Sequence, residues 1–335
     1  MANEDWMDGF TDDDTRYLTD LVLPASHDAG VSQSHYDGYW KGSSAKHTIA
    51  QRYDIAGQLA AGSRFFDLRI GRHNGQLHTF HGEGLGSLGG GWGESAQSIF
   101  QAVDAFLAAH TGEIVILRIS HTDESKGAHT LLLNSIAAQR LCCLNRNIAG
   151  IALSELRGKA IAIFDEKALS TPQPQQGLHR FVKYGDARVD HNFLGLAICG
   201  KYAGVSADMD KVGKTAIEQG NAHSDHQKMY GRHTHLFMVY WQLAFDIKSK
   251  TGKGYHGVPV DPPAFDDNQG PHYNLAYLAH VHRGNPGVGI AYKGTTYQST
   301  ITQARRKDFR PNIINLDFVS KAICDEVIAL NGDLL

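Results

Sequence analysis

The sequence predicts an α/β protein that folds as a single (β/α)8-type barrel. Apolar segments typical of buried strands alternate with amphipathic segments typical of helices along most of the 335 residues, and this alternation predicts a parallel sheet with helices outside it. A count of about seven or eight strands favours one barrel over two domains, and no shift in composition marks a linker. We therefore expect one domain over residues 1–335, with the acidic residues 1–16 as a flexible lead-in or a helical cap.

The first half of the chain supplies well-marked elements. The helix expected over 48–61 is closed by Gly62. A glycine-rich stretch, 82–93, lacks the Gly-Lys-Ser/Thr ending of a phosphate-binding loop, so we interpret it as a mobile rim loop. Apolar spacing predicts strands over 18–23, 64–70, 76–81, 113–120 and 159–165, and further helices over 95–110 and 127–141.

The second half is less regular. Residues 168–192 have the composition of a loop, and 248–270 form a long irregular insert. We predict strands over 194–199, 236–244 and 312–319, and helices over 208–220, 272–283 and 321–330.

Composition and charge exclude several functions. A net charge of −3 with no long Lys/Arg run argues against a nucleic-acid partner. No apolar run approaches the roughly 18 to 20 residues of a membrane span, and the first residues lack the features of a signal peptide. The four cysteines show no metal-ligand spacing, so they do not settle the compartment. We expect a monomer.

Charged side chains gather at the predicted strand ends. Alternation along 64–70 places Phe65, Asp67 and Arg69 on one face, which suggests a polar barrel interior. The carboxyl ends of barrel strands meet on one face, so six polar side chains are expected to converge there: His27, Asp28, Asp67, Arg69, His81 and Asp317. Two imidazoles, a guanidinium and several carboxylates suit phosphodiester cleavage by general acid–base catalysis.

Three motifs identify a family resemblance. LPASHDAG (23–30), QLAAGSRFFDLRI (58–70) and LHTFHG (77–82) resemble, in order and spacing, the X-domain of the phosphatidylinositol-specific phospholipases C. The similarity covers about residues 18–122 and is supported by 156–164 and 312–319. It implies a distorted TIM barrel, a secreted bacterial-type enzyme whose signal is missing from this sequence, and peripheral contact with membranes that contain phosphatidylinositol.

The resemblance also implies residue roles. His27 would be the general base that deprotonates the inositol 2-hydroxyl, oriented by Asp317. His81 would be the general acid that protonates the diacylglycerol oxygen, with Asp28 beside it. The products would be diacylglycerol and a 1,2-cyclic inositol phosphate, which water then opens slowly.

One position bears on metal dependence. Metal-dependent members carry a Glu-x-Asp pair on the second strand and a Glu on the fourth, whereas the corresponding residues here are Asp67, Arg69 and Ser120. An arginine would replace the cation with a fixed guanidinium, so we expect no catalytic metal. Calcium held by Asp28, Asp67 and another oxygen stays the alternative.

Alternatives exist for the substrate contacts and for the function class. Ser120, Asp165 and Trp241 are the candidate substrate-binding residues, although Asp165 could equally cap the next turn. Arg118 is expected to form an ion pair with Asp67 inside the barrel. The aromatic residues at 36–40 and 92 could enter a lipid interface or pack at the barrel rim. The alternative functions are cleavage of another headgroup and a catalytically silent X-domain that only binds phosphoinositides or membranes.

Overall fold

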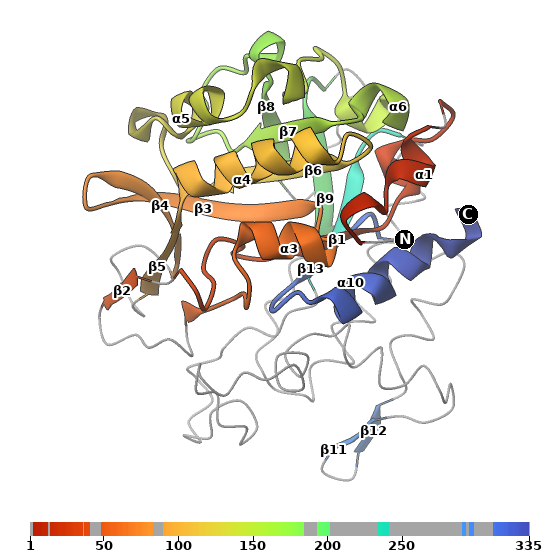
Figure 1. Cartoon of the computed structure of the whole chain (residues 1–335), viewed down its shortest axis with the longest axis horizontal. Helices are drawn as coiled ribbons and strands as arrows, with labels where there is room; N and C mark the ends of the chain where they lie inside the picture. Colours follow the sequence, from red (N-terminus) through yellow and green to blue (C-terminus); the bar gives the residue numbers. More distant parts are fainter. Residues whose placement is uncertain are drawn as a thin grey trace.

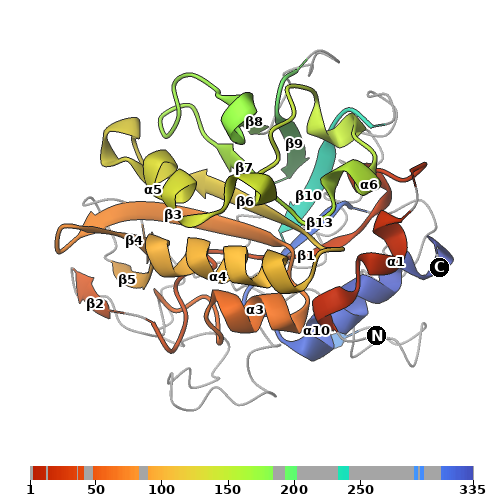
Figure 2. The same cartoon turned by 45° about the horizontal axis from the view of Figure 1, so that its top comes forward.

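Eight apolar strands pair in parallel and close into a barrel, as the sequence predicted (Figures 1 and 2). The structure is a computed structural model, which describes residues 3–12, 14–35, 37–40, 48–82, 90–183, 193–201, 233–240, 290–292, 295–297 and 311–334. The barrel strands are β1 (Leu23–Ser26), β3 (Phe65–His73), β6 (Ile114–Ser120), β7 (Lys159–Phe164), β8 (Leu178–Lys183), β9 (Leu196–Lys201), β10 (Leu236–Tyr240) and β13 (Ile313–Leu316). Their order is β1-β13-β10-β9-β8-β7-β6-β3, and pairing of β3 with β1 closes the ring.

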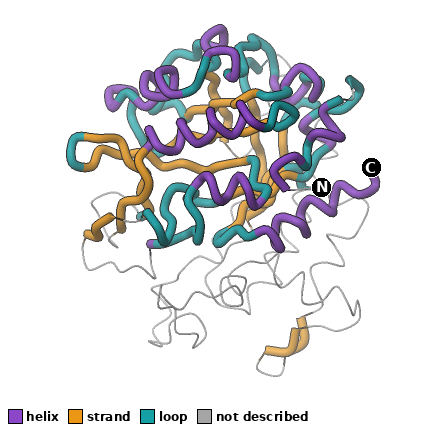
Figure 3. Tube along the Cα trace, viewed as in Figure 1, coloured by secondary structure: helices purple, strands orange, loops and turns teal. Residues whose placement is uncertain are grey.

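Alternation along the strands separates two apolar layers. On β3, Phe65 belongs to the cluster that includes the barrel interior, whereas Phe66 and Leu68 belong to an outer layer shared with Ile99 and Phe100 of α4. The described helices lie outside the sheet (Figure 3): α3 (Ile55–Ala61), α4 (Ala96–Ala109), α5 (Ala128–Ser135) and α10 (Lys321–Ile328). Between β7 and β8 the chain makes one 3-10 helix, η6 (Pro174–Gln176), instead of a long α-helix, so the barrel is distorted.

An antiparallel extension leaves the barrel at the end of β3. The second half of β3 pairs with β4 (Gln76–His81), which pairs with β5 (Gly90–Ser95), and β5 pairs with β2 (Asp37–Trp40). Asn74 and Gly75 both have positive φ, as a tight two-residue hairpin turn requires. The rim-loop interpretation of 82–93 is therefore wrong at its end, because Gly90–Gly93 belong to a strand whose pairing needs no side chains.

The amino-terminal segment also differs from the expected flexible lead-in. It forms η1 (Asn3–Asp5) and α1 (Asp8–Thr11), and Trp6, Met7 and Phe10 are almost completely buried in the core. These three apolar side chains bury enough surface to hold a segment that is otherwise acidic. The flexible assignment is thus wrong over residues 3–12.

The bounds of several helices and strands also differ from the predicted ones. Residues 18–20 form a 3-10 turn (η2), and β1 starts only at Leu23. α3 begins at Ile55 and is capped by Asp54, and residues 49–54 are not part of a helix, contrary to the prediction. β8 lies inside the segment predicted as a loop. Trp241, the predicted helices over 208–220 and 272–283, and the insert over 248–270 fall outside the described residues. None of the helices in the described part of the chain combines the length and apolar character needed to cross a bilayer.

Candidate active site

Four chain segments bring the predicted polar residues together at the carboxyl end of the barrel. Ser26 and Leu316 are the last paired residues of β1 and β13, and His27 and Asp317 follow them directly. Asp67 and Arg69 share one side of β3, as the alternation predicted. His81 ends β4, so it arrives from the antiparallel extension and not from a barrel strand as expected.

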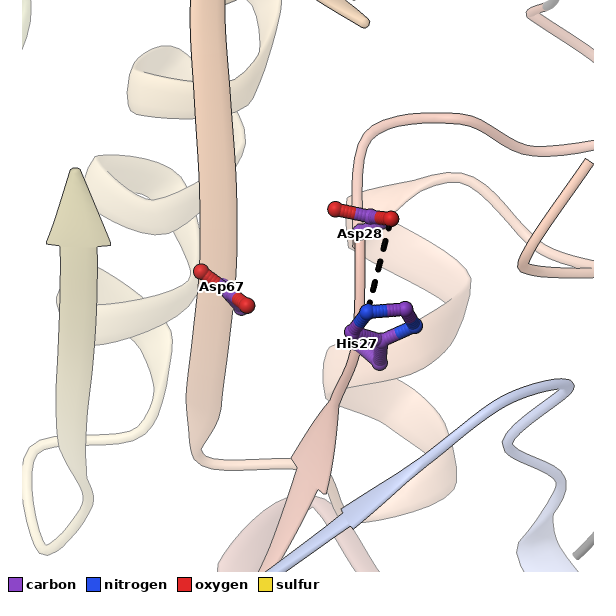
Figure 4. A group of neighbouring side chains, drawn as sticks. All are labelled: His27, Asp28 and Asp67. Atoms are coloured by element: carbon purple, nitrogen blue, oxygen red, sulfur yellow. Dashed lines mark ion pairs between the residues drawn. The ribbon is translucent and has the colours of Figure 1, made fainter. Parts of the chain in front are cut away.

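His27 and Asp317 form a hydrogen-bonded pair. The Nδ1 of His27 lies 2.8 Å from Oδ1 of Asp317, and because a carboxylate can only accept, Nδ1 carries the proton. In the neutral imidazole, Nε2 is then the atom that can take a proton. This Nε2 faces the carboxylate of Asp28 (Figure 4), at 3.4 Å from its Oδ2.

Asp28 connects the charged groups. Its Oδ1 lies 2.7 Å from Nε of Arg69, and its Oδ2 lies 3.4 Å from Nε2 of both His27 and His81. Burial alone would raise the pKa of this carboxyl, but the guanidinium of Arg69 and the two imidazoles outweigh burial and lower the pKa to about 2. Asp28 also has a positive φ of 41°, a strained conformation that aspartate tolerates better than most residues.

The two carboxylates around His27 stabilise its charged form. Burial lowers the pKa of this imidazole, yet the negative charges of Asp28 and Asp317 outweigh burial and raise the pKa to about 9. His27 is therefore mainly protonated near neutral pH before substrate binds. Its function as a base would then increase with pH.

His81 has a different set of partners. Its Nδ1 lies 2.7 Å from the backbone carbonyl of Thr48, so Nδ1 again carries the proton and Nε2 faces Asp28. The ring centroids of His27 and His81 are 6.3 Å apart, and the two ring planes make an angle of 77°. One imidazole can thus accept a proton while the other donates one to the same bound group.

Asp67 belongs to a second network of buried side chains. Arg118 forms the predicted ion pair with Asp67, at 3.1 Å, and also contacts the hydroxyl of Tyr240 at 3.3 Å and the ring of Phe181. The sequence interpretation did not include Tyr240, whereas its neighbour Trp241, which it did include, lies outside the described residues and stays a prediction. Tyr240 is in register with Asn315 on β13, two residues before Asp317, and this pairing of distant strands comes from the fold and not from a sequence pattern.

The other substrate candidates lie at the rim. The hydroxyl of Ser120 is 2.9 Å from Nδ1 of His121. Asp165 accepts backbone hydrogen bonds from His121 at 3.1 Å and from Ala168 at 2.8 Å. These contacts match the capping interpretation of Asp165, and contact of Ser120 or Asp165 with substrate stays a prediction.

The donor set does not suit calcium. His27, Asp28 and Asp67 offer three possible ligand atoms within 4.8 Å of one another. Calcium takes about six to eight oxygen ligands, whereas this group supplies two carboxylates and a nitrogen. Each carboxylate is already paired with a guanidinium, Arg69 or Arg118. The described residues therefore fit a fixed cation from the protein better than a bound calcium ion.

Comparisons with known proteins support the fold. No family model matches the chain, and no curated protein sequence matches it. The structure is similar to a phosphatidylinositol-specific phospholipase C from Listeria monocytogenes, with a TM-score of 0.57 and 16% identity over 98% of this chain and 99% of that one. A variant of the Staphylococcus aureus enzyme gives a TM-score of 0.59 at 16% identity, over 98% of both chains. The chain thus has the distorted barrel fold of these bacterial enzymes.

Proposed function

We propose that this chain is a metal-independent phospholipase C that cleaves phosphatidylinositol into diacylglycerol and a 1,2-cyclic inositol phosphate. The observation that carries the proposal is the buried carboxylate of Asp28, which is shared by one guanidinium and two imidazoles. The fold adds support, because the similar solved structures are phosphatidylinositol-specific phospholipases C.

The first half of the reaction uses His27. In its neutral form, Nε2 takes the proton of the inositol 2-hydroxyl, whose oxygen forms a new bond to the neighbouring phosphorus. The imidazolium so formed is stabilised by Asp317 at 2.8 Å and by Asp28. Attack within the same molecule yields a cyclic phosphodiester.

The second half uses Arg69 and His81. As the new bond forms, negative charge grows on the phosphate oxygens, and the guanidinium of Arg69 stabilises it. The bond from phosphorus to the glycerol oxygen then breaks, and that oxygen takes the proton from Nε2 of His81. Water can open the cyclic product by the reverse proton transfers. The substrate requires a lipid surface, so we propose peripheral membrane contact.

Phosphorus NMR tests this proposal. The purified protein is mixed with phosphatidylinositol in detergent micelles, with and without a calcium chelator. We expect the cyclic inositol phosphate signal to appear at the same rate in both samples. A rate that collapses with chelator would overturn metal independence, and no cyclic product in either sample would overturn the proposed activity.

A further inference from the structure

A short buried segment, Thr48–Gln51, lies between the chain segments that carry the two histidines. At its start, the carbonyl of Thr48 accepts the Nδ1 hydrogen bond of His81 at 2.7 Å. In its middle, the carbonyl of Ala50 accepts from the backbone N–H of Phe318, the residue after Asp317, at 2.8 Å. All four residues of this segment, which we call the crossing segment, are buried. It therefore contacts both the extension that brings His81 and the strand end that brings Asp317.

The side chain of Gln51 makes the remaining contacts. Its Nε2 donates to the carbonyl of His27 at 2.8 Å and to that of Leu316 at 3.0 Å, and its Oε1 accepts from the backbone N–H of Val319 at 3.0 Å. Gln51 is completely buried. One amide thus holds the backbone of His27 and the backbone on both sides of Asp317.

The hydrogen bonds of Gln51 lie at the point where the pairing between β1 and β13 ends. Ser26 and Leu316 are the last residues of β1 and β13 that pair, and one further backbone bond, from His27 N–H to the Leu316 carbonyl, follows at 2.9 Å. A side-chain pair at 2.8 Å needs its two backbones to be held to a fraction of an ångström. Beyond the last paired residues of the two strands, the side chain of Gln51 fixes the backbone positions of His27 and of the residues around Asp317.

We propose that Gln51 is a positioning residue, which fixes His27 against Asp317 while the same crossing segment fixes His81 through the carbonyl of Thr48. Its kinetic consequence rests on the proposed function. The geometric consequence, the alignment of His27 with Asp317, does not depend on the substrate.

The chain offers a matched control at the other end of β1. Asn331 is also completely buried. Its Nδ2 donates to the carbonyls of Val22 and Ile328, both at 3.0 Å, and its Oδ1 accepts from the backbone N–H of Val22 at 2.8 Å. Gln51 and Asn331 therefore share burial and bonding pattern, and only Gln51 holds a histidine of the site.

The experiment compares Gln51→Met with Asn331→Leu in the full chain. Both changes leave buried backbone groups without partners, so thermal unfolding should show lower Tm values for both. On phosphatidylinositol micelles, Gln51→Met should lower kcat about 100-fold with KM changed less than about threefold, because misplacement affects the transition state most. Asn331→Leu should keep kcat within about threefold of the wild type. Equal kcat losses in both variants would overturn the proposal.

A second readout separates this inference from the proposed activity. NMR titration of the His27 imidazole needs no substrate, and in Gln51→Met its midpoint should move from about 9 toward the ordinary value, because the pKa of His27 is raised by Asp28 and Asp317 against burial. Asn331→Leu should titrate like the wild type. If no cyclic product forms even with the wild type, the proposed function fails and the titration alone decides the positioning role. An unchanged midpoint in Gln51→Met would refute it. If Gln51→Met does not fold, Gln51→Asn adds no charge but shortens the side chain by one methylene, so that its amide no longer reaches all three backbone groups, and the His27 midpoint should shift in the same direction.

Discussion

Two arginines, one just before β3 and one in the middle of it, make similar ion pairs in very different surroundings. Arg64, just before the strand, is completely buried and lies 2.5 Å from Glu113. Its other N–H groups donate to four backbone carbonyls, which belong to Asn3, Glu4, Leu59 and Ser63. Arg69, inside the strand, pairs with Asp28, but its side chain is 16% exposed and Asp28 is shared with two histidines.

The difference separates a structural pair from a reactive one. Around Arg64 every donor has a fixed protein acceptor, so nothing remains for a ligand, and the pair joins the amino-terminal segment to the barrel. Around Arg69 the charges lie at the carboxyl end of the barrel, where the phosphate of the proposed substrate would bind. In barrels of this type the carboxyl end carries function and the amino end carries stability, and the proposed function assigns these two roles to Arg69 and Arg64 respectively.

The largest expected effect tests the reactive end. His27→Ala should lower phosphatidylinositol turnover at least about 1,000-fold, because the general base is lost. His110→Ala is a suitable control, since His110 pairs with Asp5 at the protein surface. A variant that keeps a tenth of the wild-type rate would remove His27 from the mechanism.

The structural end should respond in the opposite way. Arg64→Met leaves the carboxylate of Glu113 buried with no charged partner, and burial already raises the pKa of that carboxyl. Breaking one side of such a pair typically costs about 3–5 kcal/mol, which urea unfolding can measure. At temperatures where the variant remains folded, kcat should match the wild type. A large kcat loss in the folded variant would mean that the two ends are not separate.

A milder change tests the chemistry of Arg69. Arg69→Lys keeps the positive charge but loses the planar guanidinium that faces Asp28 at 2.7 Å. We expect kcat to fall about 100-fold, as for the loss of one oriented donor in the transition state, with a Tm near that of the wild type. Arg72→Lys is the matched control, because Arg72 lies on the exposed part of the same strand. Full activity in Arg69→Lys would show that charge alone is enough.

The sequence predicted most of the reactive end and little of what holds it. The strand-end histidines and the alternation of Asp67 and Arg69 are visible in the sequence because side-chain identity carries them. The crossing segment was not predicted, because two of its contacts come from the backbone carbonyls of Thr48 and Ala50, which any sequence could supply, and because a single glutamine such as Gln51 forms no recognisable motif. β8 was predicted as loop because prolines and a glycine dominate 172–177. The buried amino-terminal segment was hidden by its acidic composition.

The smallest expected effect concerns pH. Asp28 and Asp317 raise the pKa of His27 to about 9, against the opposing effect of burial. The acid limb of kcat/KM reports the base of the free enzyme, so the wild-type rate should rise with pH up to about 9. Asp317→Asn keeps the shape and an acceptor for Nδ1 but removes one negative charge. The acid limb of the kcat/KM profile should therefore lie at lower pH in Asp317→Asn than in the wild type, by about one unit.

Stability should follow the same linkage. A pKa raised on folding stabilises the native state fully below the unfolded value of about 6.5, and this contribution disappears as pH rises through about 9. Urea unfolding of the wild type should therefore show a free energy of unfolding that declines between these pH values, by at most about 1.4 kcal/mol per pH unit. In Asp317→Asn the free energy of unfolding should fall by a smaller total amount, and the fall should end at a lower pH. Parallel curves for the two proteins would mean that Asp317 does not hold the proton of His27, and His27 would then be oriented by Asp28 alone.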